Sequence, residues 1–162
     1  MPRHTPRHAR LLFTFAPGDL AVVRPFAERL KATDGTVAVD FSLTSEPFAT
    51  QRAEYVRASL EVRIRRALAT VCLFGPHTFG EDWVLWALET AHAGGRPIVA
   101  APLVTPSPRA VDLFSTLGAA IVPLRAESLA RHVATLEEGR TRPTAVAEAA
   151  VLAPRAMRHP VR

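Results

Sequence analysis

Residues 74–101 constrain the fold of this chain more than any other stretch. They read as the end of an apolar strand, a polar loop, a helix closed by Gly94-Gly95, and a second apolar strand. Glu81 and Asp82 place negative charge where the helix begins, which favours its exposed N–H groups. The glycine pair ends the helix. A strand, a helix and a strand in this order form one unit of an α/β domain, and ligands bind at the loops that follow such strands.

The rest of the chain repeats this alternation. Strands are predicted at residues 10–16, 36–41, 70–75, 98–101 and 119–122, and helices at 20–33, 52–69, 83–93, 109–117 and 127–138. The strand at 70–75 is apolar without alternation, which predicts burial on both faces. Pro25 lies inside the first helix, so either a kink or a restart with Pro25 in the first turn is expected. The pattern predicts a single α/β domain with a doubly wound, flavodoxin-like, five-stranded parallel sheet.

The positive charge of the chain is concentrated at its ends. Of the net charge of +5, residues 1–10 carry +3 and residues 139–162 carry +4, which leaves −2 for residues 11–138. We therefore expect a flexible basic segment at 1–9, a folded domain at 10–138, and a basic Pro/Ala-rich tail after it. A folded body without a concentrated basic face does not suit nucleic-acid binding.

The sequence lacks the features of membrane, secreted and metal-binding proteins. No apolar run approaches the ~18 to 20 residues of a membrane helix, and no secretory signal is visible. The single cysteine, Cys72, lies in an apolar strand and is expected to be a buried small hydrophobe rather than a nucleophile. No Cys/His cluster has zinc spacing, so no metal is expected. Together these features favour a cytoplasmic protein.

Residue type also argues against several functions of flavodoxin-like domains. A phospho-acceptor receiver needs an aspartate at the end of the third strand, where this chain has Phe74-Gly75. A flavin mononucleotide site needs a Ser/Thr/Gly-rich loop after the first strand, and the FAPGD sequence at 15–19 is not such a loop. Neither of the glycine-rich phosphate-binding motifs of dinucleotide- and triphosphate-binding proteins occurs.

A series of short motifs occurs in one order along the chain. They are FTF at 13–15, DFS at 40–42, EPF at 46–48, Tyr55-Val56, IRR at 64–66, Gly75 with Thr78, WV at 83–84 and GRPIV at 95–99. Together they resemble the TIR-like domains of the bacterial Thoeris antiphage defence system, in the branch of flavodoxin-like TIR-related proteins. The resemblance covers about residues 10–101.

The resemblance implies cleavage of the nicotinamide–ribose bond of NAD. The product in the family is often a cyclised or conjugated ADP-ribose that activates a partner effector after infection, so NAD is a substrate and no permanently bound cofactor is expected. Loss of nicotinamide leaves an oxocarbenium-like ribose, which a nearby carboxylate stabilises, while an aromatic wall excludes water. Five residues are expected to bind the substrate, because of the resemblance and because of their positions near the ends of strands. They are Phe15, Ser42, Phe48, Thr78 and Trp83.

The expected catalytic glutamate is replaced by Ala87. In the family this glutamate stands four residues after the helix tryptophan, in a W-V-x-x-E pattern that begins here at 83–84. Glu89 lies roughly 200° further around the helix than position 87, so it faces elsewhere and does not replace the glutamate. Glu81 and Asp82 precede the helix and are poor substitutes. Three explanations remain open: a deliberate Glu→Ala inactivation, a naturally inert relative, and the use of another carboxylate.

Two further functions remain beside NAD cleavage. One is a non-catalytic TIR-like signalling or scaffold module that acts by self-association, and the other is a nucleoside deoxyribosyltransferase-like N-glycosidase. Structural roles also fit the residues, since Trp83 suits a core position, Ser42 a turn cap, and Phe48 a hydrophobic plug. The NAD hypothesis requires that Trp83 and the methyl group of Ala87 border a cleft beside the Ser42 loop.

Overall fold

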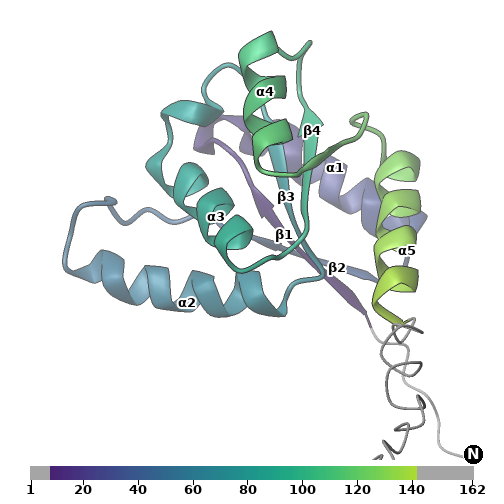
Figure 1. Cartoon of the computed structure of the whole chain (residues 1–162), viewed down its shortest axis with the longest axis horizontal. Coiled ribbons are helices and arrows are strands. Elements are labelled where there is room, and N and C mark those ends of the chain that lie inside the picture. Colours follow the sequence, from purple (N-terminus) through teal and green to yellow (C-terminus); the bar gives the residue numbers. More distant parts are fainter. Residues whose placement is uncertain (1–7, 142–162) are drawn as a thin grey trace, which may run out of the picture.

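A five-stranded parallel sheet lies between two layers of helices in the computed structural model, which describes residues 8–141 (Figure 1). The strand order is β2-β1-β3-β4-β5. The strands are β1 (Ala9–Thr14), β2 (Val37–Phe41), β3 (Ala69–Phe74), β4 (Ile98–Pro102) and β5 (Ala120–Ile121). This is the flavodoxin-like order, so the predicted fold class is confirmed.

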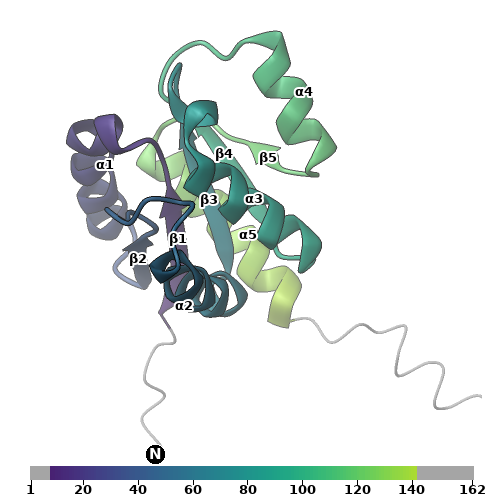
Figure 2. The same ribbon diagram turned by 90° about the vertical axis from the view of Figure 1, so that its left-hand side faces the viewer.

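The helices divide between the two faces of the sheet. They are α1 (Leu20–Thr33), α2 (Arg52–Arg66), α3 (Asp82–Ala93), α4 (Pro108–Thr116) and α5 (Ala126–Thr141), with short 3-10 turns at Pro17–Asp19 and Thr78–Gly80. Side chains of α1 and α5 pack with Phe13 in one apolar layer, and those of α2, α3 and α4 pack with Leu12 in the other. Every residue of β3 is buried, as its uninterrupted apolar run predicts. Figure 2 shows α4 next to β4 and β5.

Two helices differ from their predicted form. α1 continues without interruption from Leu20 through Pro25 to Thr33, so of the two alternatives expected at the proline, the restart does not occur. Pro25 has no N–H to donate to the carbonyl four residues earlier in the helix. Because Pro25 is exposed, water can bond to that carbonyl instead. α2 ends at Arg66 rather than at residue 69 because Ala67 is already extended. The N–H of Leu68 then donates to the carbonyl of Arg10, which places the following residues in the sheet.

The strand at one edge of the sheet is very short. β5 contains only Ala120 and Ile121, fewer residues than the predicted 119–122, and they pair with Val99 and Ala100 of β4. The loop that follows continues the contact for one more residue, since Val122 N–H donates to the carbonyl of Ala100. The sheet therefore ends on this side with few free backbone groups.

The predicted terminal segments lie mostly outside the described residues. α5 extends to Thr141, past the predicted domain boundary at 138. The remainder of the predicted tail, and residues 1–7 of the predicted basic segment, fall outside the part of the chain that the structure describes. Within residues 8–141, none of the helices is both long enough and apolar enough to cross a membrane.

Candidate functional site

The loops that follow the carboxyl ends of the strands lie at one edge of the sheet, because all strand pairs are parallel. β1 connects through α1 to β2 on one side, whereas β3 connects through α3 to β4 on the other. The order of the strands therefore reverses between β1 and β3. In open α/β sheets the crevice at such a reversal is the usual place for a ligand.

The loop after β2 is bound to α3 through Trp83. The indole Nε1–H of Trp83 donates to the carbonyl of Glu46 at 2.8 Å. The Trp83 ring also meets Phe48 edge to face, with 5.0 Å between ring centroids, and meets Trp86 in the same manner at 6.0 Å. The structure thus brings together two of the predicted aromatic site residues, and it uses their polar and apolar groups to hold the loop.

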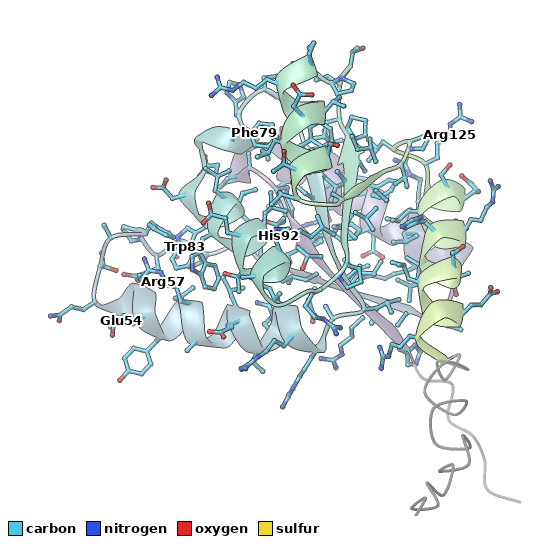
Figure 3. All side chains as sticks on the ribbon, viewed as in Figure 1. Glu54, Arg57, Phe79, Trp83, His92 and Arg125 are labelled. Atoms are coloured by element: carbon cyan, nitrogen blue, oxygen red, sulfur yellow. The ribbon has the colours of Figure 1, made fainter. Side chains whose placement is uncertain are left out.

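Arg57 of α2 completes this attachment. Its guanidinium lies 4.4 Å from the centre of the Phe48 ring and donates to the carbonyl of Phe48 at 2.8 Å. It is also 5.7 Å from the centre of the Trp83 ring, and Figure 3 shows the two side chains close together between α2 and α3. We refer to Glu46, Phe48, Arg57 and Trp83 as the loop clamp.

Sequence reasoning missed the role of two arginines. A run of arginines on a surface helix usually forms a solvated face, and Arg65 and Arg66 are exposed in this way. Arg57 and Arg63 instead are half-buried, and Arg63 donates to the carbonyl of Phe41 at 2.7 Å. The carbonyls of Phe41, at the end of β2, and of Phe48, in the loop after it, need partners, and long side chains from α2 supply them. Helical spacing could have revealed the half-buried position of Arg57, because Arg57 stands three residues before the buried Leu60 and so lies on the same side of the helix.

Ala87 does not border an open cleft, so this part of the sequence-based expectation is wrong. Its side chain is 0% exposed and packs in the apolar layer that includes Leu12, Phe74 and Leu88. Trp83, one turn earlier, is half-buried. The spacing argument placed both residues on the inward side of α3 but gave no information on what covers that side.

Three other predicted site residues lie at strand ends, as expected, with little exposed surface. Phe15 is buried against Phe41 with ring centroids 5.3 Å apart. The N–H of Ser42 donates to the carbonyl of Phe13, and its residue is 6% exposed. The hydroxyl oxygen of the fully buried Thr78 accepts the N–H of Gly75 at 2.8 Å. These bonds shape the loops, and substrate contact by the three residues stays a prediction.

Two of the hollows at this edge lie beside the predicted site loops. One, of about 230 Å³, lies between the loops after β3 and β4, and its walls include Phe74, Gly75, Phe79 and Val104. The other, of about 280 Å³, lies between the loop after β2 and α2, and its walls include Ser42, Tyr55 and Arg63. Neither lining includes Trp83 or Ala87. The edge is therefore open, but at places other than the one the sequence pattern predicts.

Neither a reactive cysteine nor a metal-binding cluster is found among the described residues. Cys72 is buried in β3, and burial raises the pKa of its thiol well above the usual range. A thiol in this state is a poor nucleophile, which confirms its assignment as a core residue. Within residues 8–141, no three His, Cys, Asp or Glu side chains are grouped so that they could hold a metal ion.

The fold and its open edge define a flavodoxin-like α/β domain, and comparison with known proteins gives the family. The family described as Thoeris protein ThsB, TIR-like domain, matches residues 15–105, which is more than half of the chain. The chain belongs to this family, and the resemblance inferred from its motifs is confirmed.

A similar solved structure is that of the Clostridium botulinum CMP N-glycosidase BcmB. It is 11% identical, with a TM-score of 0.50, over 78% of this chain and 98% of that chain. At this identity the likeness shows the fold alone. No curated protein matches the chain.

Proposed function

We propose that this chain is a Thoeris TIR-like domain of cytoplasmic antiphage defence that binds NAD and cleaves its nicotinamide–ribose bond slowly. Membership of the family over residues 15–105 carries the proposal. The slow rate follows from Ala87, which stands where the catalytic glutamate is expected. Because Ala87 is buried in an apolar layer, the proposal does not rely on a cleft at this residue, and NAD would have to enter elsewhere at the open edge of the sheet. The signal would be an ADP-ribose-type product that acts on a separate effector protein.

The reaction explains why a carboxylate matters at position 87. The bond between ribose C1′ and the nicotinamide nitrogen breaks, and its electron pair leaves with nicotinamide. Water, or a second nucleophile of the substrate, then adds to C1′ and a proton is released. A methyl group can neither accept a hydrogen bond from the ribose hydroxyls nor offset the positive charge on the ribose. Losing one stabilising group of this kind typically lowers a rate by about 10² to 10³.

The decisive experiment compares the unmodified chain with Ala87→Glu and Ala87→Gln during incubation with NAD. Mass spectrometry then measures nicotinamide and ADP-ribose products. We expect Ala87→Glu to release nicotinamide about a hundredfold faster than the unmodified chain, and Ala87→Gln to give no gain. Glutamine has the shape of glutamate without its charge, so it controls for packing at this buried site. Thermal unfolding of each variant establishes that the compared proteins are folded.

Two outcomes of this experiment contradict the proposal. If folded Ala87→Glu is silent, and the chain neither binds nor cleaves NAD but forms oligomers in solution, the domain is a non-catalytic scaffold that self-associates. If base release occurs from other nucleotides and not from NAD, the domain is a nucleotide or deoxynucleoside N-glycosidase. The observation in favour of the N-glycosidase alternative is the name of the structural neighbour, a CMP N-glycosidase of the same architecture.

A further inference from the structure

The hollow between the loop after β2 and α2, here called the α2 hollow, contains a buried hydroxyl group that the fold does not use. Val39 and Phe41 of β2 pack in the apolar layer of α1 and α5, so Ser42, which continues the strand alternation, faces α2. Ser42 lines the hollow and is only 6% exposed. Its hydroxyl forms no hydrogen bond with any other residue from 8 to 141. Buried hydroxyl groups normally have a partner, and a ligand in the hollow would supply one.

Arg63 places a positive charge in the same wall. It is half-buried, and its Nη2 donates to the carbonyl of Phe41 at 2.7 Å, which holds the guanidinium at the hollow. Within the part of the chain that the structure describes, no acidic side chain forms an ion pair with it. None of the residues that line the hollow is acidic. Because a guanidinium has several N–H donors, Arg63 can still bind an anion there.

The other walls restrict the size and charge of that anion. Leu43, Val56 and Leu60 supply aliphatic surface, and the exposed Ser59 and Tyr55 add hydroxyl groups on the α2 side. The volume of about 280 Å³ lies just below the roughly 300 to 1,000 Å³ of pockets for drug-sized ligands, so a group the size of one side chain fits. A single cationic residue in the lining suits one negative charge, and a guanidinium matches the planar shape of a carboxylate.

We propose that the α2 hollow binds a carboxylate carried on a short aliphatic stem. Arg63 and Ser42 donate hydrogen bonds to the carboxylate oxygens, and the aliphatic walls enclose the stem. The carboxyl end of a peptide chain and a small free carboxylic acid share this chemistry. Trp83 and Ala87 do not line the hollow, so this binding site does not depend on NAD cleavage.

N-acetyl-leucine and N-acetyl-leucinamide test the proposal, because they share the stem and differ in the carboxylate. Nuclear magnetic resonance titration of the isotope-labelled full chain follows the amide signals of residues 42–44 and 55–63. For a ligand of about a dozen non-hydrogen atoms we expect a Kd on the order of 1 mM for the acid, and binding of the amide about tenfold weaker.

The free acid 3-methylbutanoate distinguishes the two sources of the carboxylate. It has the same branched stem without the acetylated amine. Binding as tight as that of N-acetyl-leucine supports a small free acid as the ligand. Binding of N-acetyl-leucine alone supports the end of a peptide chain.

Two variants remove the two donors separately. Ser42→Ala deletes a hydroxyl that holds nothing in the fold, so it should keep the thermal midpoint and weaken binding of N-acetyl-leucine by about threefold to tenfold. Arg63→Gln removes the charge and should abolish the difference between acid and amide. Because Arg63 also holds the Phe41 carbonyl, thermal unfolding establishes that this variant is folded, and Ser42→Ala decides the question if it is not.

The matched controls are Ser45→Ala and Arg66→Gln. Ser45 is an exposed serine of the same loop and Arg66 an exposed arginine of the same helix. Neither residue lines the hollow, so both variants should bind the acid as the unmodified chain does.

Equal affinities for N-acetyl-leucine and its amide overturn the proposal, as does the absence of binding at about ten times the expected Kd. A preference for the acid that survives Ser42→Ala and Arg63→Gln overturns it too. Tighter binding of inorganic phosphate contradicts the single negative charge. If NAD displaces N-acetyl-leucine, the hollow belongs to the nucleotide site and the proposal is wrong. If the acid binds as expected while Ala87→Glu is silent toward NAD, the carboxylate site stands and only the NAD proposal fails.

Discussion

The loop after β2 and the tip of β3 lie at the same edge of the sheet but differ in how their polar groups are bound. In the loop clamp, the carbonyls of Glu46 and Phe48 both accept hydrogen bonds from side chains of neighbouring helices. At the tip of β3, Asp19 Oδ2 has no partner and Gly75 presents no side chain. The difference shows that side-chain hydrogen bonds fix the backbone of the first region, whereas the second region leaves a buried carboxylate oxygen without a partner.

The largest effect is expected at Phe114, which packs on Phe74 near Gly75. Replacing it tests whether these aromatic side chains belong to the core. Phe114 is 0% exposed and lies 4.7 Å from Phe74, centroid to centroid. Phe114→Ala should lower the free energy of unfolding by about 3 to 5 kcal/mol, because it leaves a cavity. Phe48→Ala, at a half-buried ring of the loop clamp, should cost less. Urea denaturation of both variants measures the free energy of unfolding. Equal losses would show that Phe114 is no more important to the core than Phe48 of the loop clamp.

The loop clamp itself is tested by Trp83→Phe. Phenylalanine keeps an aromatic ring but lacks the N–H that Glu46 accepts, so the expected loss is about 1 kcal/mol. Amide hydrogen exchange in residues 42–51 should become faster. Trp86→Phe is the control, since Trp86 contacts the Trp83 ring from within α3 and its replacement should leave exchange in the loop unchanged. Unchanged exchange in Trp83→Phe would mean that the loop is held by other contacts.

A smaller effect is expected at Arg57. Lysine retains the positive charge but cannot lie flat on Phe48 while it donates to the Phe48 carbonyl. Arg57→Lys should therefore lower stability by about 0.5 to 1 kcal/mol, seen as a lower thermal midpoint. Arg66→Lys, at an exposed position of the same helix, should change the midpoint little. Indistinguishable midpoints for the two variants would show that Arg57 is only part of a solvated face.

The smallest effect is expected at Asp19. Because its side chain caps nothing, Asp19→Asn should change the free energy of unfolding by less than about 0.5 kcal/mol. Ser107 is the contrasting case, since its hydroxyl oxygen accepts the N–H of Ala110 at the start of α4. Ser107→Ala should cost about 1 kcal/mol. If chemical denaturation gives Asp19→Asn the larger cost, the carboxylate already stabilises the fold.

Local patterns were sufficient for most of the fold. The apolar run of β3, the periodicity of α2 and the glycine pair after α3 each specify an element from a few neighbouring residues. The order of the elements then restricts the topology, because strand–helix–strand units connect with one handedness. The family followed from the spacing of short motifs. β5 was the weakest prediction, since a two-residue strand has too little pattern to bound it.

The site was less predictable because its features depend on residues far apart in the sequence. Helical spacing correctly grouped Trp83 with position 87, but the burial of Ala87 depends on β1 and β3 side chains that cover it. The bonds of Arg57 and Arg63 reach backbone carbonyls, which no sequence pattern marks. The approach of Asp19 to Gly75 joins the loops after two different strands, and it becomes visible only when both strand tips are placed.

The two-residue β5 has a consequence for how copies of this domain could associate. A growing β-ribbon needs a row of unpaired N–H and C=O groups as its template, and the β5 side of the sheet presents almost none beyond Ala120 and Ile121. Lateral addition of a strand from another molecule is therefore poorly supported there. Any filament or ring built from this domain would have to grow through helix and loop surfaces or from the β2 side.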